Sequence, residues 1–156
     1  MDRHDFMQRA VELSRQKMHE HRGGPFAAVV VLDGRIVGEG WNSVTSSNDP
    51  TAHAEVSAIR DACARLGTFS LEGADLYTSC EPCPMCLAAA YWARIGRVFY
   101  ANTTADAAAI GFDDAVLYEQ LTLAAEQRSL PCERLTLDEA EAVFAEWDAM
   151  PDKVPY

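Results

Sequence analysis

The sequence has no cluster of lysine or arginine residues, and its 24 acidic side chains outnumber the 13 basic ones. The formal net charge at pH 7 is −11. A protein that holds nucleic acid needs a basic surface, because it must displace the counterions that surround the phosphates. The composition therefore argues against a tRNA or DNA partner and favours a small-molecule substrate.

Long apolar runs are also missing. No stretch approaches the ~20 apolar residues of a membrane-spanning helix, so no membrane partner is expected. The residues from Met1 to Asp5 lack the basic and apolar segments of a secretory signal. Five cysteines are an odd number, and once two are assigned to a metal, Cys63, Cys80 and Cys132 are expected to be free thiols. We therefore expect a cytoplasmic protein.

No internal repeat, low-complexity tract or linker divides the 156 residues, of which 49% are hydrophobic. The length fits one domain with a substantial core, so we expect a single domain over residues 1–156. Apolar periodicity and turn signals predict helices that alternate with strands. The expected helices cover residues 5–19, 51–66, 83–94 and 104–110, with a last helix that starts at Thr136 or Asp138 through a Thr136/Glu139 capping box. The expected strands cover residues 26–32, 36–41, 74–79, 97–101 and 130–137, the first two joined by an Asp33-Gly34 hairpin.

The most informative pattern is His53-Ala54-Glu55 followed by Pro82-Cys83-Pro84-Met85-Cys86. Two thiolates three residues apart at one helix start, with an imidazole from a second helix, supply three ligands to one zinc ion. The fourth tetrahedral position is left for water or hydroxide, as in catalytic zinc sites. Glu55, two residues beyond His53, is close enough to reach that water without binding the metal.

Each half of the pattern also has a non-catalytic interpretation. Cys83 and Cys86 could form a redox pair or half of a structural zinc knuckle, and an H-x-E segment alone means little. The two halves in this order, with the prolines, are far more specific. Both are predicted at helix N-termini, where the partial positive charge favours thiolates.

The whole set of motifs resembles the cytidine deaminase superfamily, whose zinc deaminases carry the signature H-x-E…P-C-x-x-C. Within that superfamily it is most similar to the bacterial guanine deaminases. The matching stretches are residues 23–26 (GGPF), 48–55 (NDPTAHAE), 77–86 (YTSCEPCPMC), 91–94 (YWAR) and 111–114 (GFDD). The first three are shared widely among purine-type deaminases, the last two point more narrowly to guanine, and the C-terminal third matches loosely. The resemblance implies a three-layer α/β/α sandwich with a five-stranded mixed sheet.

The resemblance also implies a reaction and its residues. Guanine would be hydrolysed at C2 to xanthine and ammonia, with one zinc per subunit held by His53, Cys83 and Cys86. Glu55 would be the acid/base, and Asp114 would assist proton movement to the leaving amine, with Glu119 a weaker candidate for that task. Glu81 is taken as structural, capping the second metal helix. The implied substrate contacts are Asn42, Phe26, Ala54, Trp92 and Tyr156.

Structural alternatives stand beside several of these roles. Asn42 could serve an ordinary turn, Phe26 and Trp92 could be core aromatics, and Asp114 could belong to a surface turn. In the resembled enzymes the C-terminal segment crosses to the partner subunit. We therefore expect a homodimer in which residues 138–156 are exchanged, with Tyr156 at the tip of a lid.

Other functions remain open. Guanosine deaminase shares the chemistry, as does any small-molecule purine or azaheterocycle deaminase. A tRNA adenosine deaminase conflicts with the acidic charge, and a cytosine or cytidine deaminase lacks the purine-type stretches. A non-catalytic zinc scaffold would have no use for Glu55.

Overall fold

Four strands form one mixed sheet in the computed structural model, which describes residues 1–156. The strands are β1 (Ala27–Leu32), β2 (Arg35–Trp41), β3 (Asp75–Cys80) and β4 (Arg97–Asn102), in the order β2-β1-β3-β4. β1 is antiparallel to both β2 and β3, whereas β3 and β4 are parallel. Asp33 and Gly34 have φ angles of +49° and +72°, as a two-residue type I′ hairpin requires, so the predicted hairpin is confirmed.

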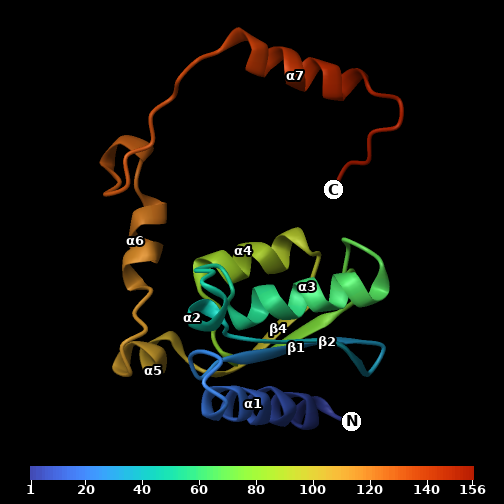
Figure 1. Cartoon of the computed structure of the whole chain (residues 1–156), viewed down its shortest axis with the longest axis vertical. Helices are drawn as coiled ribbons and strands as arrows, with labels where there is room; N and C mark the ends of the chain where they lie inside the picture. The colour runs from blue at the N-terminus through green and yellow to red at the C-terminus, as the bar shows by residue number, and fades with distance from the viewer. The chain divides into compact units, whose positions relative to one another are not determined.

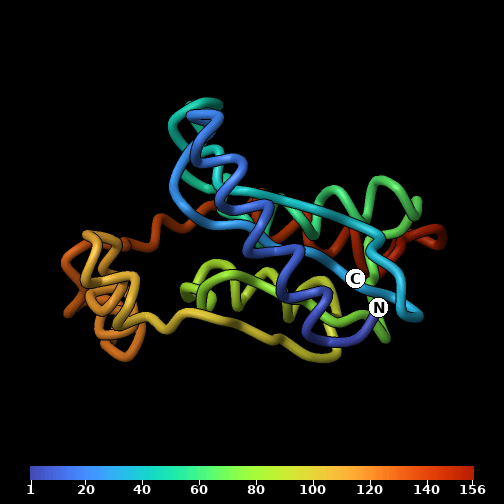
Figure 2. Tube along the Cα trace, turned by 90° about the horizontal axis from the view of Figure 1, so that it is seen from below, coloured from blue at the N-terminus to red at the C-terminus, as the bar shows by residue number.

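Helices cover both faces of this sheet (Figure 1). α1 (Arg3–His19) lies on one face, and Figure 2 shows it crossing the strands, while α3 (Ala54–Leu66) and α4 (Pro84–Trp92) lie on the other face. Alternate side chains of β1 point to opposite faces, as a pleated strand dictates. Val29 and Val31 pack with Phe6 and Tyr77 beneath α1, whereas Ala28 and Val30 join the larger core beneath α3 and α4. The three-layer α/β/α arrangement is therefore confirmed.

The chain divides into two compact units, Met1–Ala115 and Val116–Tyr156. The first holds the sheet, the three covering helices, α2 (Val44–Ser47) and α5 (Thr104–Ala109). The second is made by most of α6 (Ala115–Thr122), the short 3-10 turn η1 (Ala125–Gln127) and α7 (Asp138–Ala149). No helix is both long enough and apolar enough to cross a bilayer.

The expected fifth strand, residues 130–137, does not form, so the sheet has four strands instead of five. Pro131 lacks the N–H that a ladder bond needs, and the Leu135 side chain is 91% exposed. The unit that contains this segment has no strand to pair with it. The leucines of this segment were therefore not sufficient evidence for a strand.

Smaller corrections concern helix ends. Residues 42–50, for which no helix or strand was expected, contain α2, and the helix expected from Thr51 begins at Ala54. The Thr136/Glu139 capping box is absent, because the residue before α7 is Leu137 and it makes no side-chain cap. Sequence patterns define the first and last residues of a helix only to within a few positions.

Candidate functional site

Three metal-binding side chains meet where two helices begin. His53 is the residue immediately before α3, and Cys83 is the residue immediately before α4. Pro84 occupies the first position of α4, where a missing N–H costs nothing, and Cys86 follows in the same first turn. The strand-to-helix connection after β3 thus delivers both thiols to one point.

The donor atoms lie at distances that suit a single zinc ion. The His53 Nδ1 atom is 3.5 Å from the Sγ atoms of both cysteines, and the two sulfurs are 3.6 Å apart. Zinc–sulfur bonds of about 2.3 Å and zinc–nitrogen bonds of about 2.0–2.1 Å give tetrahedral edges of roughly 3.6 Å for S···N and 3.8 Å for S···S. The observed triangle matches those edges, and one sulfur, that of Cys86, belongs to a fully buried residue. The residues therefore fit zinc, with three protein ligands.

The electrostatics of the cluster favour one deprotonated sulfur, that of Cys83. A hydrogen bond from Cys86, and then one from His53, lowers the pKa of Cys83 to about 4. The pKa of Cys86 is raised by its hydrogen bond to the Cys83 thiolate and by burial. That of His53 is raised by its hydrogen bond with Cys83. Two sulfurs and an imidazole in contact thus share protons that a cation would displace.

Glu55 lies in the first turn of α3 and is 7% exposed. Burial raises the pKa of this carboxyl group. The Thr78 hydroxyl lies 3.3 Å from Glu55 Oε1 and 3.0 Å from the Cys80 carbonyl oxygen. A buried carboxyl beside the metal ligands, with a hydroxyl as partner, is equipped to accept and return a proton.

Thr78 was not singled out by the sequence reasoning. It is 1% exposed and stands in β3, 23 residues from Glu55 along the chain. The available signal was a Thr-Ser pair in the buried part of β3, which leads into the metal motif. A buried hydroxyl must find a partner, and here the partners are the Cys80 carbonyl and the Glu55 carboxyl.

Two further carboxylates lie near the sulfur cluster. Burial raises the pKa of Asp114, with smaller contributions from Cys83, Asp113 and Glu81, so Asp114 lies within electrostatic reach of the metal ligands. Glu81 accepts a hydrogen bond from the Thr104 N–H at 3.0 Å. It therefore caps the start of α5, and the prediction that it caps the second metal helix was wrong.

Asn42 follows β2 directly and is 8% exposed. Its Oδ1 atom accepts hydrogen bonds from the N–H groups of Gly24 and Val44, both at 3.3 Å. Since the oxygen is engaged on the protein side, the amide nitrogen is the group left to donate to a ligand.

Phe26 and Ala54 have contrasting surroundings. Phe26 makes an edge-to-face contact with Phe112 at 4.9 Å between ring centroids and also packs on the larger core. Ala54 is buried at the first position of α3, where backbone N–H groups have no partner within the helix. Ala54 thus brings an N–H donor next to His53 and Glu55.

The other predicted site residues are not brought to this cluster within the first unit. Trp92 is the last residue of α4, about 13 Å along the helix axis from Cys83 at 1.5 Å per residue. Glu119 and Tyr156 belong to the second unit. The roles assigned to all three stay predictions.

Comparison with known proteins agrees with this geometry. Residues 1–102 match the family model described as the cytidine and deoxycytidylate deaminase zinc-binding region. The chain is 51% identical to a guanine deaminase of Bacillus subtilis (strain 168) over 156 residues, which is all of both chains. It is also 53% identical to a tRNA-specific adenosine deaminase of Agrobacterium fabrum, over 76 residues that make up 49% of this chain and 50% of that relative.

A solved structure shows the same full-length similarity to guanine deaminase in three dimensions. The X-ray structure of guanine deaminase from Bacillus subtilis matches with a TM-score of 0.97 at 51% identity, covering 100% of this chain and 99% of the other. The similarity to guanine deaminase therefore extends through both units, whereas the similarity to the tRNA enzyme is confined to half of the chain.

Proposed function

Because this chain belongs to the cytidine and deoxycytidylate deaminase family, we propose that it is a zinc-dependent guanine deaminase. It hydrolyses guanine to xanthine and ammonia. The observation that carries the proposal is the buried Glu55 carboxyl beside a three-ligand zinc site, in a chain similar to guanine deaminase over its whole length. The substrate is a small molecule.

Zinc is the cofactor, and His53, Cys83 and Cys86 are the residues that hold it. When bound, the ion supplies Lewis acidity that brings the pKa of a water ligand down towards ~7. The remaining chemistry belongs to the side chains around it.

Glu55 acts as the acid/base of the reaction. Its carboxylate takes a proton from the attacking water and delivers it to N3 of guanine, the ring nitrogen next to C2 that carries no hydrogen. C2 becomes tetrahedral as the water oxygen adds. Burial raises the pKa of Glu55, which makes its carboxylate a stronger base for taking the proton from water.

The leaving amine needs a second proton. We assign that transfer to Asp114, and the assignment is supported by the raised pKa that burial gives this carboxyl and by its electrostatic interaction with Cys83. Ammonia then departs and the C2 carbonyl of xanthine forms. The atoms balance as guanine plus water giving xanthine plus ammonia.

Asn42 and Ala54 recognise the purine by donating hydrogen bonds. Asn42 offers its amide nitrogen, since its oxygen is held by two backbone N–H groups. Ala54 offers the free N–H of the first helical turn. Phe26 supplies an aromatic wall, whose orientation is supported by its edge-to-face contact with Phe112.

The working enzyme is a cytoplasmic homodimer in which residues 138–156 are exchanged between subunits, and each chain forms one deaminase domain. α7 supports this arrangement, because Phe144 is 80% exposed and Trp147 46% exposed on a helix that must bury its apolar face to be stable. Trp92 and Tyr156 are assigned to the completed site of that assembly. The absence of disulfides among the five cysteines supports a reducing compartment.

The test is ammonia release from zinc-loaded protein offered guanine, guanosine, adenine and cytosine in parallel. Turnover of guanine alone is expected. Turnover of guanosine without guanine would move the assignment to a nucleoside deaminase. No turnover of any of the four would remove the proposed activity.

A further inference from the structure

The metal helix α3 rests directly on the backbone of the edge strand β2. A Cβ atom added to Gly40 would lie 2.2 Å from the Ala58 nitrogen and 2.4 Å from the Ala54 carbonyl oxygen. One added to Gly38 would lie 2.6 Å from the Ala58 carbonyl oxygen. Real Cβ atoms do not approach other atoms within 3.0 Å, so neither position accepts a side chain without moving the helix.

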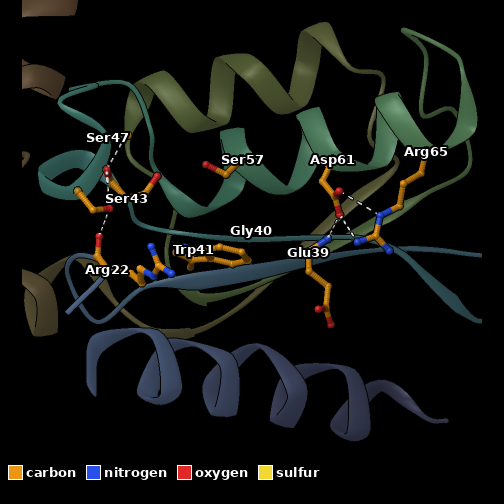
Figure 3. Close-up of a pocket in the computed structure, with 10 residues that line it drawn as sticks. Arg22, Glu39, Gly40, Trp41, Ser43, Ser47, Ser57, Asp61 and Arg65 are labelled. Atoms are coloured by element: carbon orange, nitrogen blue, oxygen red, sulfur yellow. Dashed lines mark hydrogen bonds and ion pairs between the residues drawn. The ribbon is translucent and has the colours of Figure 1, made fainter. Parts of the chain in front are cut away.

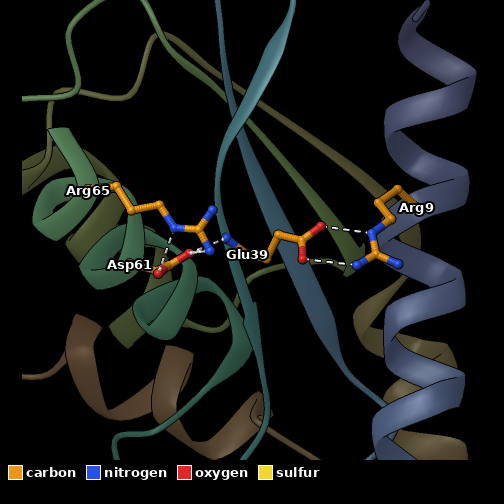
Figure 4. A network of polar contacts seen from close by, with 4 residues as sticks. All are labelled: Arg9, Glu39, Asp61 and Arg65. Carbon is orange, nitrogen blue, oxygen red and sulfur yellow. Dashed lines mark hydrogen bonds and ion pairs between the residues drawn. The ribbon is translucent and has the colours of Figure 1, made fainter.

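Polar bonds tie the same segment of β2 to the helices on both faces of the sheet (Figure 4). The Glu39 N–H, on the open edge of the sheet, donates to Asp61 of α3 at 2.9 Å. The Glu39 carboxylate accepts two bonds from Arg9 of α1, at 2.7 and 2.9 Å. One N–H of the edge strand is thereby occupied, and β2 is linked to both α3 and α1.

A cavity of about 480 Å³ opens beside this contact, between β2, α2 and α3 (Figure 3). Four of its polar side chains are already paired within the protein, since Asp61 pairs with Arg65 and the hydroxyls of Ser46 and Ser47 bond to backbone carbonyls.

The two glycines meet overlapping parts of α3, because both approach backbone atoms of Ala58. Gly40 alone also approaches the first turn, at the Ala54 carbonyl, which lies between the zinc ligand His53 and Glu55. Gly38 faces Ala58 and Ala62, one to two turns further from the metal. Lengthening the 2.2 Å contact to 3.0 Å needs a displacement of about 0.8 Å, which at the first turn would move a metal ligand and the acid/base together.

We propose that Gly40 is a positioning residue for the zinc site: its missing side chain sets the depth at which the first turn of α3 presents His53 and Glu55. This inference rests on the proposed function, since it assigns Gly40 a role in the same site. It predicts that volume at position 40 perturbs the metal environment, whereas equal volume at position 38 perturbs mainly the fold.

The experiment compares Gly40→Ala, Gly38→Ala and Gly96→Ala in full-length protein. Gly96 is exposed, has no left-handed φ, and its added Cβ would meet only the Ala74 oxygen, at 3.4 Å. The measurements are melting temperature, zinc affinity by chelator competition, the visible spectrum of the Co²⁺-substituted protein, and kcat and KM for guanine. Gly40→Ala is expected to lose about 10- to 100-fold in zinc affinity or kcat, as for other residues that orient metal ligands, and to alter the Co²⁺ spectrum. KM should change far less than kcat.

Gly96→Ala should match the parent protein, and Gly38→Ala should lower the melting temperature while largely retaining the parent Co²⁺ spectrum. The proposal is overturned if Gly40→Ala lowers stability but keeps the parent zinc affinity, Co²⁺ spectrum and kcat. If the parent protein turns over no guanine, the proposed function fails, while the metal measurements still decide the role of Gly40.

If Gly40→Ala does not fold, the proposal is tested with Asp61→Ala instead. Arg65→Ala is the control, and the Co²⁺ spectra of the two variants are compared. Both lose the exposed ion pair between these residues, but only Asp61→Ala also removes the acceptor for the Glu39 N–H. An altered Co²⁺ spectrum in Asp61→Ala alone supports the proposal, and identical parent-like spectra in both variants contradict it.

Discussion

Thr78→Val tests whether the hydroxyl beside Glu55 contributes to catalysis. The substitution keeps the shape of the side chain and removes a group 3.3 Å from Glu55 Oε1. Hydrogen bonds to charged groups contribute about 1.5–3 kcal/mol, and at this length the lower end applies. Since about 1.4 kcal/mol corresponds to a factor of ten in rate, kcat should fall about tenfold. Stability should also fall by about 1 kcal/mol, because the buried Cys80 carbonyl loses its partner.

The assay is steady-state deamination of guanine, with chemical denaturation and zinc content measured on the same preparations. Ser79→Ala is the matched control. It removes a neighbouring buried hydroxyl, which accepts a bond from the Ala27 N–H at 3.1 Å and does not contact Glu55. Ser79→Ala should lose comparable stability and keep the parent kcat. The reasoning is refuted if both variants retain the parent kcat, or if both lose it equally.

Three further outcomes are expected. Glu55→Gln should keep one zinc per chain, by elemental analysis, and lose about 10²–10⁴-fold in kcat because it cannot move a proton; loss of zinc with activity would make Glu55 structural. Cys83→Ala should lose zinc and activity together, because two ligands remain of three; dialysed Cys83→Ala protein that still holds one tightly bound zinc per chain would contradict the ligand assignment. Removal of residues 150–156 should lower guanine turnover and weaken dimers measured by analytical ultracentrifugation; parent-like values of both would exclude a role for the tail.

The metal centre could be predicted from sequence because its chemistry is encoded in short spacings. His53 and Glu55 lie two residues apart, Cys83 and Cys86 three, and each pair lies at one helix start. The Asp33-Gly34 hairpin and the β-branched first strand were equally local signals. Such features depend on a few neighbouring residues, so they can be predicted without knowledge of the fold.

Contacts between distant segments could not be predicted in this way. Thr78 meets Glu55 only because β3 lies beneath α3, and Glu39 meets Asp61 only because α3 lies along the edge of β2. The apolar pattern of residues 130–137 predicted a strand. A strand also needs a neighbouring strand to pair with, and a local sequence pattern does not show whether one is present. Glu81 stood next to one helix and capped another.

The central claim is that this chain hydrolyses guanine at C2. The most direct measurement is to incubate the zinc-loaded protein with guanine in ¹⁸O-labelled water and to analyse the products by mass spectrometry. Hydrolysis at C2 predicts xanthine that carries one ¹⁸O atom, with one ammonia released per guanine consumed, and no such product from Glu55→Gln on the same timescale. Unchanged guanine, in a preparation that contains one zinc per chain, would contradict it.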